Sequence, residues 1–105
     1  MRQVAVVPEP AGEVRRVMVY NAGNDGVYLF LYRSLDDGPG FADYWFESPA
    51  DAVECAEREY GIRPGDWHSV PDPRPGCQHD WIAPIRVKRG PDGQPLWGQF
   101  EPAPG

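Results

Sequence analysis

One short stretch of this sequence collects most of its chemically reactive side chains. Residues 67–81 contain both histidines, one of the two cysteines and two of the four tryptophans. These side chains stand at the two ends of the stretch, and the connection between them has proline at every second position from 71 to 75. If that connection bends back, a binding patch forms from the residues Trp67, His68, His79 and Trp81.

Nucleophilic catalysis is the first chemistry that these residues suggest. Cys77 would supply a thiolate, His79 the base that deprotonates it, and Asp80 the group that orients the base. His68 is an equally suitable base. The Cys-x-His spacing is only weakly diagnostic, because catalytic cysteine and histidine usually come from separate parts of a chain. No oxyanion hole or glycine-rich elbow accompanies it, so these three residues are catalytic candidates only.

A metal site is the second possibility. His68, Cys77 and His79 offer the nitrogen and sulfur ligands that zinc favours, with Asp80 or Cys55 as the fourth ligand. Structural zinc sites normally show a paired spacing such as Cys-x₂₋₄-Cys, which this sequence lacks. A phosphate-binding glycine loop is also missing, so we predict no cofactor.

A structural role is the third possibility, and it is the one we favour. Asp80 would brace a turn by accepting hydrogen bonds from backbone N–H groups. His79 would bond a backbone carbonyl, Trp81 would belong to the core, and Cys77 would be a semi-buried small residue. In this interpretation the stretch organises a loop and carries out no reaction.

A helix is the clearest of the elements that must position this stretch. Ser48 is a good N-cap, Pro49 takes the favoured first helical position, and Asp51 completes a Ser-x-x-Asp capping box. Gly61 suits the left-handed position that follows the end of a helix. The sequence therefore predicts a single helix over residues 49–60.

Strands are predicted on both sides of this helix, from β-branched and aromatic runs bounded by turn residues. The run over residues 27–32 is apolar at every position, which places it inside a sheet with both faces at least partly covered. Strands grouped around one helix imply an α+β fold, with an antiparallel, meander-like sheet of about five or six strands and the helix on one face. The candidate strands are residues 4–7 (as an edge strand), 14–20, 27–32, 43–47, 67–70, 81–88 and 96–100.

Length and composition fit one small domain. The chain has 105 residues, 41% of them hydrophobic, which is enough for one core. We expect residues 1–100 to form a single compact α+β domain and residues 101–105 a loose, proline-rich tail. The sequence has no membrane-length apolar run and no signal-peptide core, and it has only two cysteines. We therefore expect a cytoplasmic protein.

Negative charge is concentrated in one region. The formal net charge is −6, and residues 36–59 hold eight acids and one base, a net charge of −7. Nucleic acids and anionic membranes require a basic surface, so neither is an expected partner. An acidic surface instead favours another protein, one with a basic face.

The C-terminal half carries two recognisable motifs, Pro75-Gly76-Cys77-Gln78-His79-Asp80-Trp81-Ile82-Ala83-Pro84 and, after Arg86-Val87-Lys88, a Leu96-Trp97-Gly98 hairpin. In these motifs and in the predicted helix, the chain resembles a group of short uncharacterised bacterial proteins. The similarity is weaker over residues 28–45. No activity is attached to that group, so the resemblance implies no catalytic or binding residue.

Three functions are compatible with these residues. We favour a non-enzymatic protein-binding or regulatory module, one version of which is an inhibitor or immunity-type protein that covers a basic enzyme. The second is a small Cys/His-dependent enzyme or metal-binding protein that uses residues 67–81. The third is an oligomeric small-molecule binder lined by Tyr28, Phe30, Tyr32 and Trp45. Neither the partner nor the oligomeric state follows from the sequence.

Overall fold

The computed structural model describes residues 1–103 and has the predicted α+β architecture. Two short 3₁₀ turns, η1 (Gly23–Asp25) and η2 (Pro64–Asp66), lie in its connections. The elements are the helix α1 (Pro49–Tyr60) and the strands β1 (Arg2–Val6), β2 (Arg16–Asn21), β3 (Val27–Tyr32), β4 (Ala42–Phe46), β5 (His68–Val70), β6 (Ile85–Arg89) and β7 (Pro95–Pro102).

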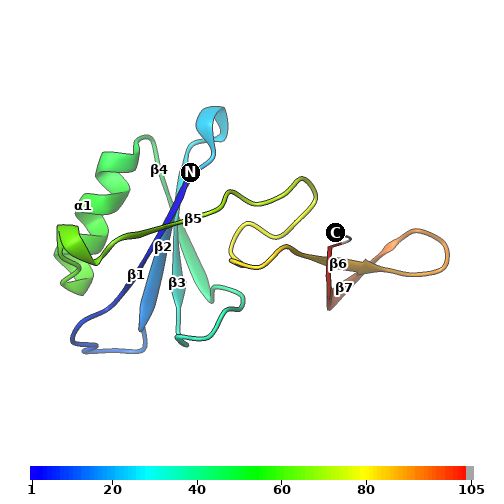
Figure 1. Ribbon diagram of the computed structural model, residues 1–105, viewed down its shortest axis with the longest axis horizontal. Helices are drawn as coiled ribbons and strands as arrows, with labels where there is room; N and C mark the ends of the chain where they lie inside the picture. Colours follow the sequence, from blue (N-terminus) through cyan, green and yellow to red (C-terminus); the bar gives the residue numbers. More distant parts are fainter. Residues whose placement is uncertain (104–105) are drawn as a thin grey trace.

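Five strands form one antiparallel sheet in the order β4-β3-β2-β1-β5 (Figure 1). Strands β1 to β4 are a meander, because each pairs with the next along the chain. After α1 the chain returns and adds β5 to the outer side of β1. The predicted antiparallel sheet with one helix on a face is therefore confirmed. The predicted edge position of residues 4–7 is wrong, because β1 is paired on both sides.

Helix α1 begins and ends where its capping residues predict. The Ser48 hydroxyl accepts a hydrogen bond from the Asp51 N–H at 3.2 Å, and Gly61 adopts φ +68° at the end of the helix. Ala52 and Ala56 are fully buried against the sheet, and such small side chains let a helix lie close to it. Within residues 1–103, no helix has the length and apolar character needed to cross a membrane.

Alternation along the strands gives the sheet two different faces. On the face away from α1, Arg2, Met18 and Tyr32 are almost completely buried. We call residues 71–84 the covering loop, because they lie over that second face (Figure 1). The face under α1 holds the apolar core, which consists of Ala5, Val7, Val17, Val19, Val27, Leu29, Leu31, Ala52, Ala56 and Ile62.

Strands β6 and β7 form a separate two-stranded sheet, which we call the arm (residues 85–102). The arm extends away from the five-stranded sheet, beyond the covering loop (Figure 1). The molecule consequently measures 46 × 29 × 22 Å along its principal axes. The predicted unit of residues 1–100 thus consists of a sheet-and-helix body and a projecting arm.

The C-terminal strands differ from their predicted limits. The loose tail predicted from residue 101 is wrong at its start, because Glu101 and Pro102 belong to β7. The N–H of Ala103 then donates to the Pro84 carbonyl at 2.7 Å, and residues 104–105 lie outside the described residues. The strand predicted over residues 81–88 begins only at Ile85. The first residues of that predicted strand are in the covering loop, where the carbonyls of Trp81 and Ile82 accept hydrogen bonds from the Arg2 side chain.

Candidate functional site

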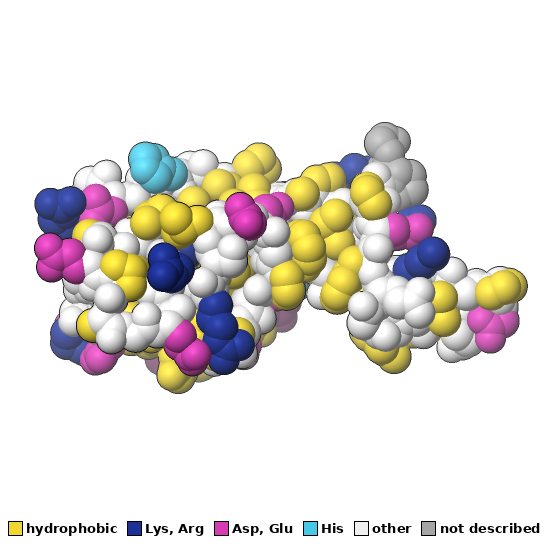
Figure 2. Space-filling model, turned by 90° about the horizontal axis from the view of Figure 1, so that it is seen from below, with side chains coloured by type: hydrophobic (Ala, Val, Ile, Leu, Met, Phe, Trp, Pro, Cys, Tyr) yellow, Lys and Arg dark blue, Asp and Glu magenta, His cyan; other side chains and the backbone are white. Residues whose placement is uncertain are grey.

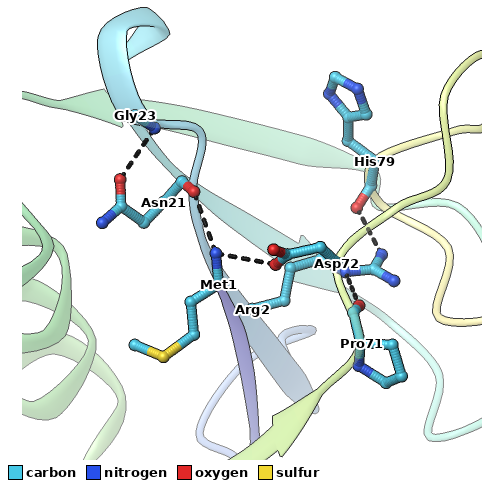
Figure 3. Close-up of polar contacts among 7 residues, drawn as sticks. All are labelled: Met1, Arg2, Asn21, Gly23, Pro71, Asp72 and His79. Atoms are coloured by element: carbon cyan, nitrogen blue, oxygen red, sulfur yellow. Dashed lines mark hydrogen bonds and ion pairs between the residues drawn. The ribbon is translucent and has the colours of Figure 1, made fainter.

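A buried arginine holds the covering loop on the sheet. Arg2 of β1 is only 1% exposed, and its guanidinium donates to four backbone carbonyls. Those of Pro71 and His79 accept at 2.6 and 3.0 Å, and those of Trp81 and Ile82 at 2.5 and 3.3 Å (Figure 3 draws the first two). A guanidinium has five donors in a planar fork, so one side chain can bind both ends of the loop.

The charge of Arg2 sits in an unusual environment. Burial lowers the pKa of Arg2, while nearby Tyr32 and Asp72 oppose that shift. Four carbonyl oxygens surround the guanidinium, so backbone dipoles supply much of the stabilisation that water would give it. A buried charge is costly to leave without its partners, which makes Arg2 the main link between the loop and the sheet.

Two acidic side chains fix the end of the covering loop. The Asp80 carboxylate accepts a hydrogen bond from the Gly40 N–H at 3.0 Å. The Asp37 carboxylate accepts from the N–H groups of Ile82 and Ala83, each at 2.8 Å. The start of the acidic segment at residues 36–59 therefore contacts the covering loop, and the Asp37 carboxylate helps to hold that loop in place.

Tyr32 connects the covering loop to β3. Its hydroxyl donates to the Asp80 backbone carbonyl, and the guanidinium of Arg16 lies over its ring, 4.0 Å from the ring centre. Burial raises the pKa of Tyr32 well above the ordinary value of 10.0, and the Asp80 carboxylate raises it further. Tyr32 is therefore a neutral, protonated phenol in the folded protein.

The three catalytic candidates lie close in the loop and make structural contacts. Cys77 is 7% exposed, and its N–H donates to the Arg74 carbonyl at 3.0 Å. The His79 imidazole meets the Tyr20 ring edge-on, with 5.0 Å between ring centres. Figure 3 shows this imidazole turned away from Arg2 while the His79 carbonyl accepts from it. With the Asp80 carboxylate bonded to a backbone N–H, the contacts match a braced loop.

The four residues of the predicted binding patch do not come together. Trp67 packs against the core under α1, and its indole N–H donates to the Glu57 carboxylate at 3.3 Å. His68 is exposed on the edge strand β5. His79 and Trp81 belong to the covering loop on the opposite face. The sheet therefore separates Trp67 from His79.

The predicted metal ligands are also dispersed. Within the described part of the chain, no three His, Cys, Asp or Glu side chains are arranged to hold an ion. Cys55 is on α1, whereas Cys77 is in the covering loop beyond the sheet, and both thiols are free. The predicted set of His68, Cys77 and His79, with Asp80 or Cys55, is therefore not assembled.

An open groove lies between the covering loop and the aromatic side chains of β3. It has a volume of about 370 Å³. The Tyr28 and Phe30 rings stand parallel in it, 5.9 Å apart. The sequence predicts that Tyr32 and Trp45 also line a small-molecule pocket. In the structure, Tyr32 is buried under the loop and Trp45 is exposed beside the groove. The groove is lined by Tyr28, Phe30, Asp43, Cys77, Gln78 and His79.

Sequence reasoning missed Arg2 and Asp37, which organise the loop, and Asp43, which lines the groove. The sequence did contain a weak signal for Arg2. Arg2 lies two positions before the apolar residue Val4 in β1, so the two side chains point to the same face of the strand. A charged residue in such a position must bury its charge against something or leave the sheet. Asp37 and Asp43 carry no comparable signal, because acids in a long acidic segment normally face solvent.

Comparisons with protein-family models, curated proteins and solved structures find no match to this chain. Function must consequently be inferred from the surfaces themselves. The most informative are the covering loop, several of whose backbone carbonyls bind Arg2, and the arm, whose Trp97 is largely exposed.

Proposed function

We propose that this protein is a non-enzymatic protein-binding module, and that the arm is part of its contact surface. The observation that carries the proposal is the exposure of two aromatic side chains on β7. Trp97 is 79% exposed and Phe100 is 42% exposed. Tryptophan side chains dominate the binding energy of many protein interfaces, because each buries a large area at little cost in conformational entropy.

The architecture of the arm supports this proposal. Strands β6 and β7 pair only with each other in the described residues. A two-stranded hairpin is at best marginally stable alone in water and needs a third strand or a packing face. The body supplies a little of this at the base, where the Phe100 and Trp81 ring centres are 6.0 Å apart. A partner that covers Trp97 would supply the rest.

Surface character supports a protein partner as well. Figure 2 shows hydrophobic side chains gathered at the neck between the body and the arm, with acidic and basic groups spread over the body. The segment at residues 36–59 has a net charge of −7 and would attract a basic partner, mainly by raising the association rate. An inhibitor or immunity-type role against a basic enzyme is the most specific form of the proposal.

The alternative of a Cys/His enzyme or metal protein has weaker support. Cys77 is buried, the Asp80 carboxylate holds the Gly40 N–H, and within residues 1–103 no three His, Cys, Asp or Glu side chains are arranged to hold an ion. A catalytic centre requires a nucleophile that substrate can reach and a base free to accept its proton. A small-molecule binder retains only Tyr28 and Phe30 of its four predicted lining residues.

Capture of a partner by the immobilised protein tests the proposal. We expect the wild type to retain at least one protein from a lysate of its source organism. We expect Trp97→Ser to reduce that capture by about tenfold or more, because a central interface tryptophan is typically worth at least 1.4 kcal/mol. Leu35→Ser is the matched control, since Leu35 is 56% exposed but lies outside the arm.

Salt dependence separates the two parts of the proposal. Capture should weaken at high salt if the acidic segment steers the partner, because exposed charges are screened there. Capture that both variants lose equally, or that the wild type never shows, would contradict an arm-mediated interface. Circular dichroism of each variant checks that the fold is intact.

A further inference from the structure

The groove beside the covering loop continues along β4 into a second hollow of about 260 Å³. Phe30 and Asp43 line both hollows, so the two meet at this pair. We call the combined depression the aromatic groove. Phe30 and Asp43 are directly paired across β3 and β4, which places a ring and a carboxylate side by side on one face.

The charge of the aromatic groove has one sign. Asp43 and Asp80 contribute carboxylates, and none of its lining residues is a lysine or an arginine. The guanidinium of Arg33 lies 4.1 Å from the centre of the lining ring of Phe41 and pairs with Glu13 at 3.0 Å. Among the residues that the structure describes, no lysine or arginine lines the groove at the junction of Phe30 and Asp43.

We propose that the aromatic groove binds an arginine side chain of the partner, at the junction of Phe30 and Asp43. This inference rests on the proposed protein-binding function and names the chemistry of the partner. A guanidinium is planar, stacks on aromatic faces and binds carboxylates through two parallel hydrogen bonds. Asp43 is exposed, so its carboxylate is reachable from solvent.

The protein already uses this combination of groups beside the groove. Arg33 stacks on Phe41 while Glu13 pairs with its guanidinium, which is the same set of cation, ring and carboxylate. Phe30 and Asp43 offer the ring and the carboxylate without the cation. An arginine from a basic partner completes the set, and its charge is opposite to that of the Asp43 and Asp80 carboxylates that line the groove.

The test is a titration of the ¹⁵N-labelled protein with a short peptide that contains one arginine, followed by NMR. Saturable shifts are expected at the backbone amides of residues 28–30, 42–44 and 78–80. The same peptide with citrulline keeps the shape but loses the charge, and it should cause no saturable shift. A lysine peptide should bind more weakly, because its ammonium lacks the planar fork.

Two variants with the same change in charge make the test specific. Asp43→Asn should weaken arginine-peptide binding by about fivefold or more. Asp51→Asn removes an acid from the exposed surface of α1 and should leave binding unchanged. Equal effects of the two variants, or equal binding of the citrulline peptide, would overturn the inference. Phe30→Leu gives a second check, since loss of the ring should weaken arginine binding while the fold is kept.

Failure here is distinguishable from failure of the proposed function. If Trp97-dependent capture is observed but arginine-peptide binding is absent, the partner uses the arm and this inference is wrong. If neither is observed, both proposals fail. Reduced capture by Asp43→Asn, with normal capture by Asp51→Asn, would support both.

Discussion

Replacing Arg2 with alanine is expected to lower the free energy of unfolding by about 3 kcal/mol. The change removes every donor that Arg2 gives to the carbonyls of Pro71, His79, Trp81 and Ile82. It also leaves a cavity between β1 and the covering loop. The loop should then detach more often than the rest of the fold unfolds, because Arg2 binds carbonyls at both of its ends.

Two companion variants and two measurements make this result specific. Arg2→Lys keeps the charge but loses the planar fork, so it should recover less than half of the lost stability. Arg15→Ala, on an exposed neighbour of β2, should have little effect. Urea unfolding gives the free energies, and hydrogen exchange of amides 78–83 reports loop opening. Similar stability and exchange for Arg2→Ala and Arg15→Ala would show that Arg2 does not hold the loop.

The second large effect is a loss of stability at alkaline pH that depends on Tyr32. Burial and the Asp80 carboxylate raise the pKa of Tyr32 in the folded protein, whereas the unfolded tyrosine ionises near the ordinary value of 10.0. Above that pH the unfolded state releases a proton that the folded state keeps. The contribution of Tyr32 is therefore complete below pH 10 and declines above it, by about 1.4 kcal/mol per pH unit.

Urea unfolding at increasing pH, in the wild type and in Tyr32→Phe, measures this contribution. The variant should be less stable at neutral pH by about 1 kcal/mol, because the hydrogen bond to the Asp80 carbonyl is lost. Its stability should decline less steeply above pH 10, so that the two curves converge. Tyr44→Phe, on the exposed surface of β4, serves as the control. Parallel curves for wild type and Tyr32→Phe would exclude this role for Tyr32.

The parts of the fold that were predictable from the sequence are those determined by neighbouring residues. Helix α1 follows from Ser48, Pro49 and Gly61, all within one turn of its ends. The β2–β3 pair follows from apolar runs on either side of a short polar loop. In each case local propensity, capping and alternation agree, so no distant contact was needed to predict the element.

The remaining features depend on distant contacts. Strand β1 is interior rather than an edge because β5, more than sixty positions later, pairs with it. The strand expected from residue 81 starts at Ile85 because carbonyls before it bind Arg2, about eighty positions away. The local sequence of β6 and β7 predicts a hairpin but does not indicate whether that hairpin joins the main sheet.

The candidate site shows the same division. Cys77, His79 and Asp80 are close in sequence, so their proximity in the loop was certain in any fold. Their structural role is determined by distant groups, namely the Arg2 guanidinium and the Gly40 N–H. The sequence contains Trp97 but does not predict its exposure, which results from the projection of the arm away from the body.

The reactive-looking residues of the covering loop make contacts that brace it, and we propose that the protein acts by binding. The most direct test is the rate at which iodoacetamide modifies Cys77 at neutral pH in a Cys55→Ala variant, where Cys77 is the sole thiol. Because Cys77 is 7% exposed, we expect modification at least about tenfold slower in the folded protein than in urea. Modification of folded Cys77 faster than in urea would indicate an activated thiolate and would contradict the account.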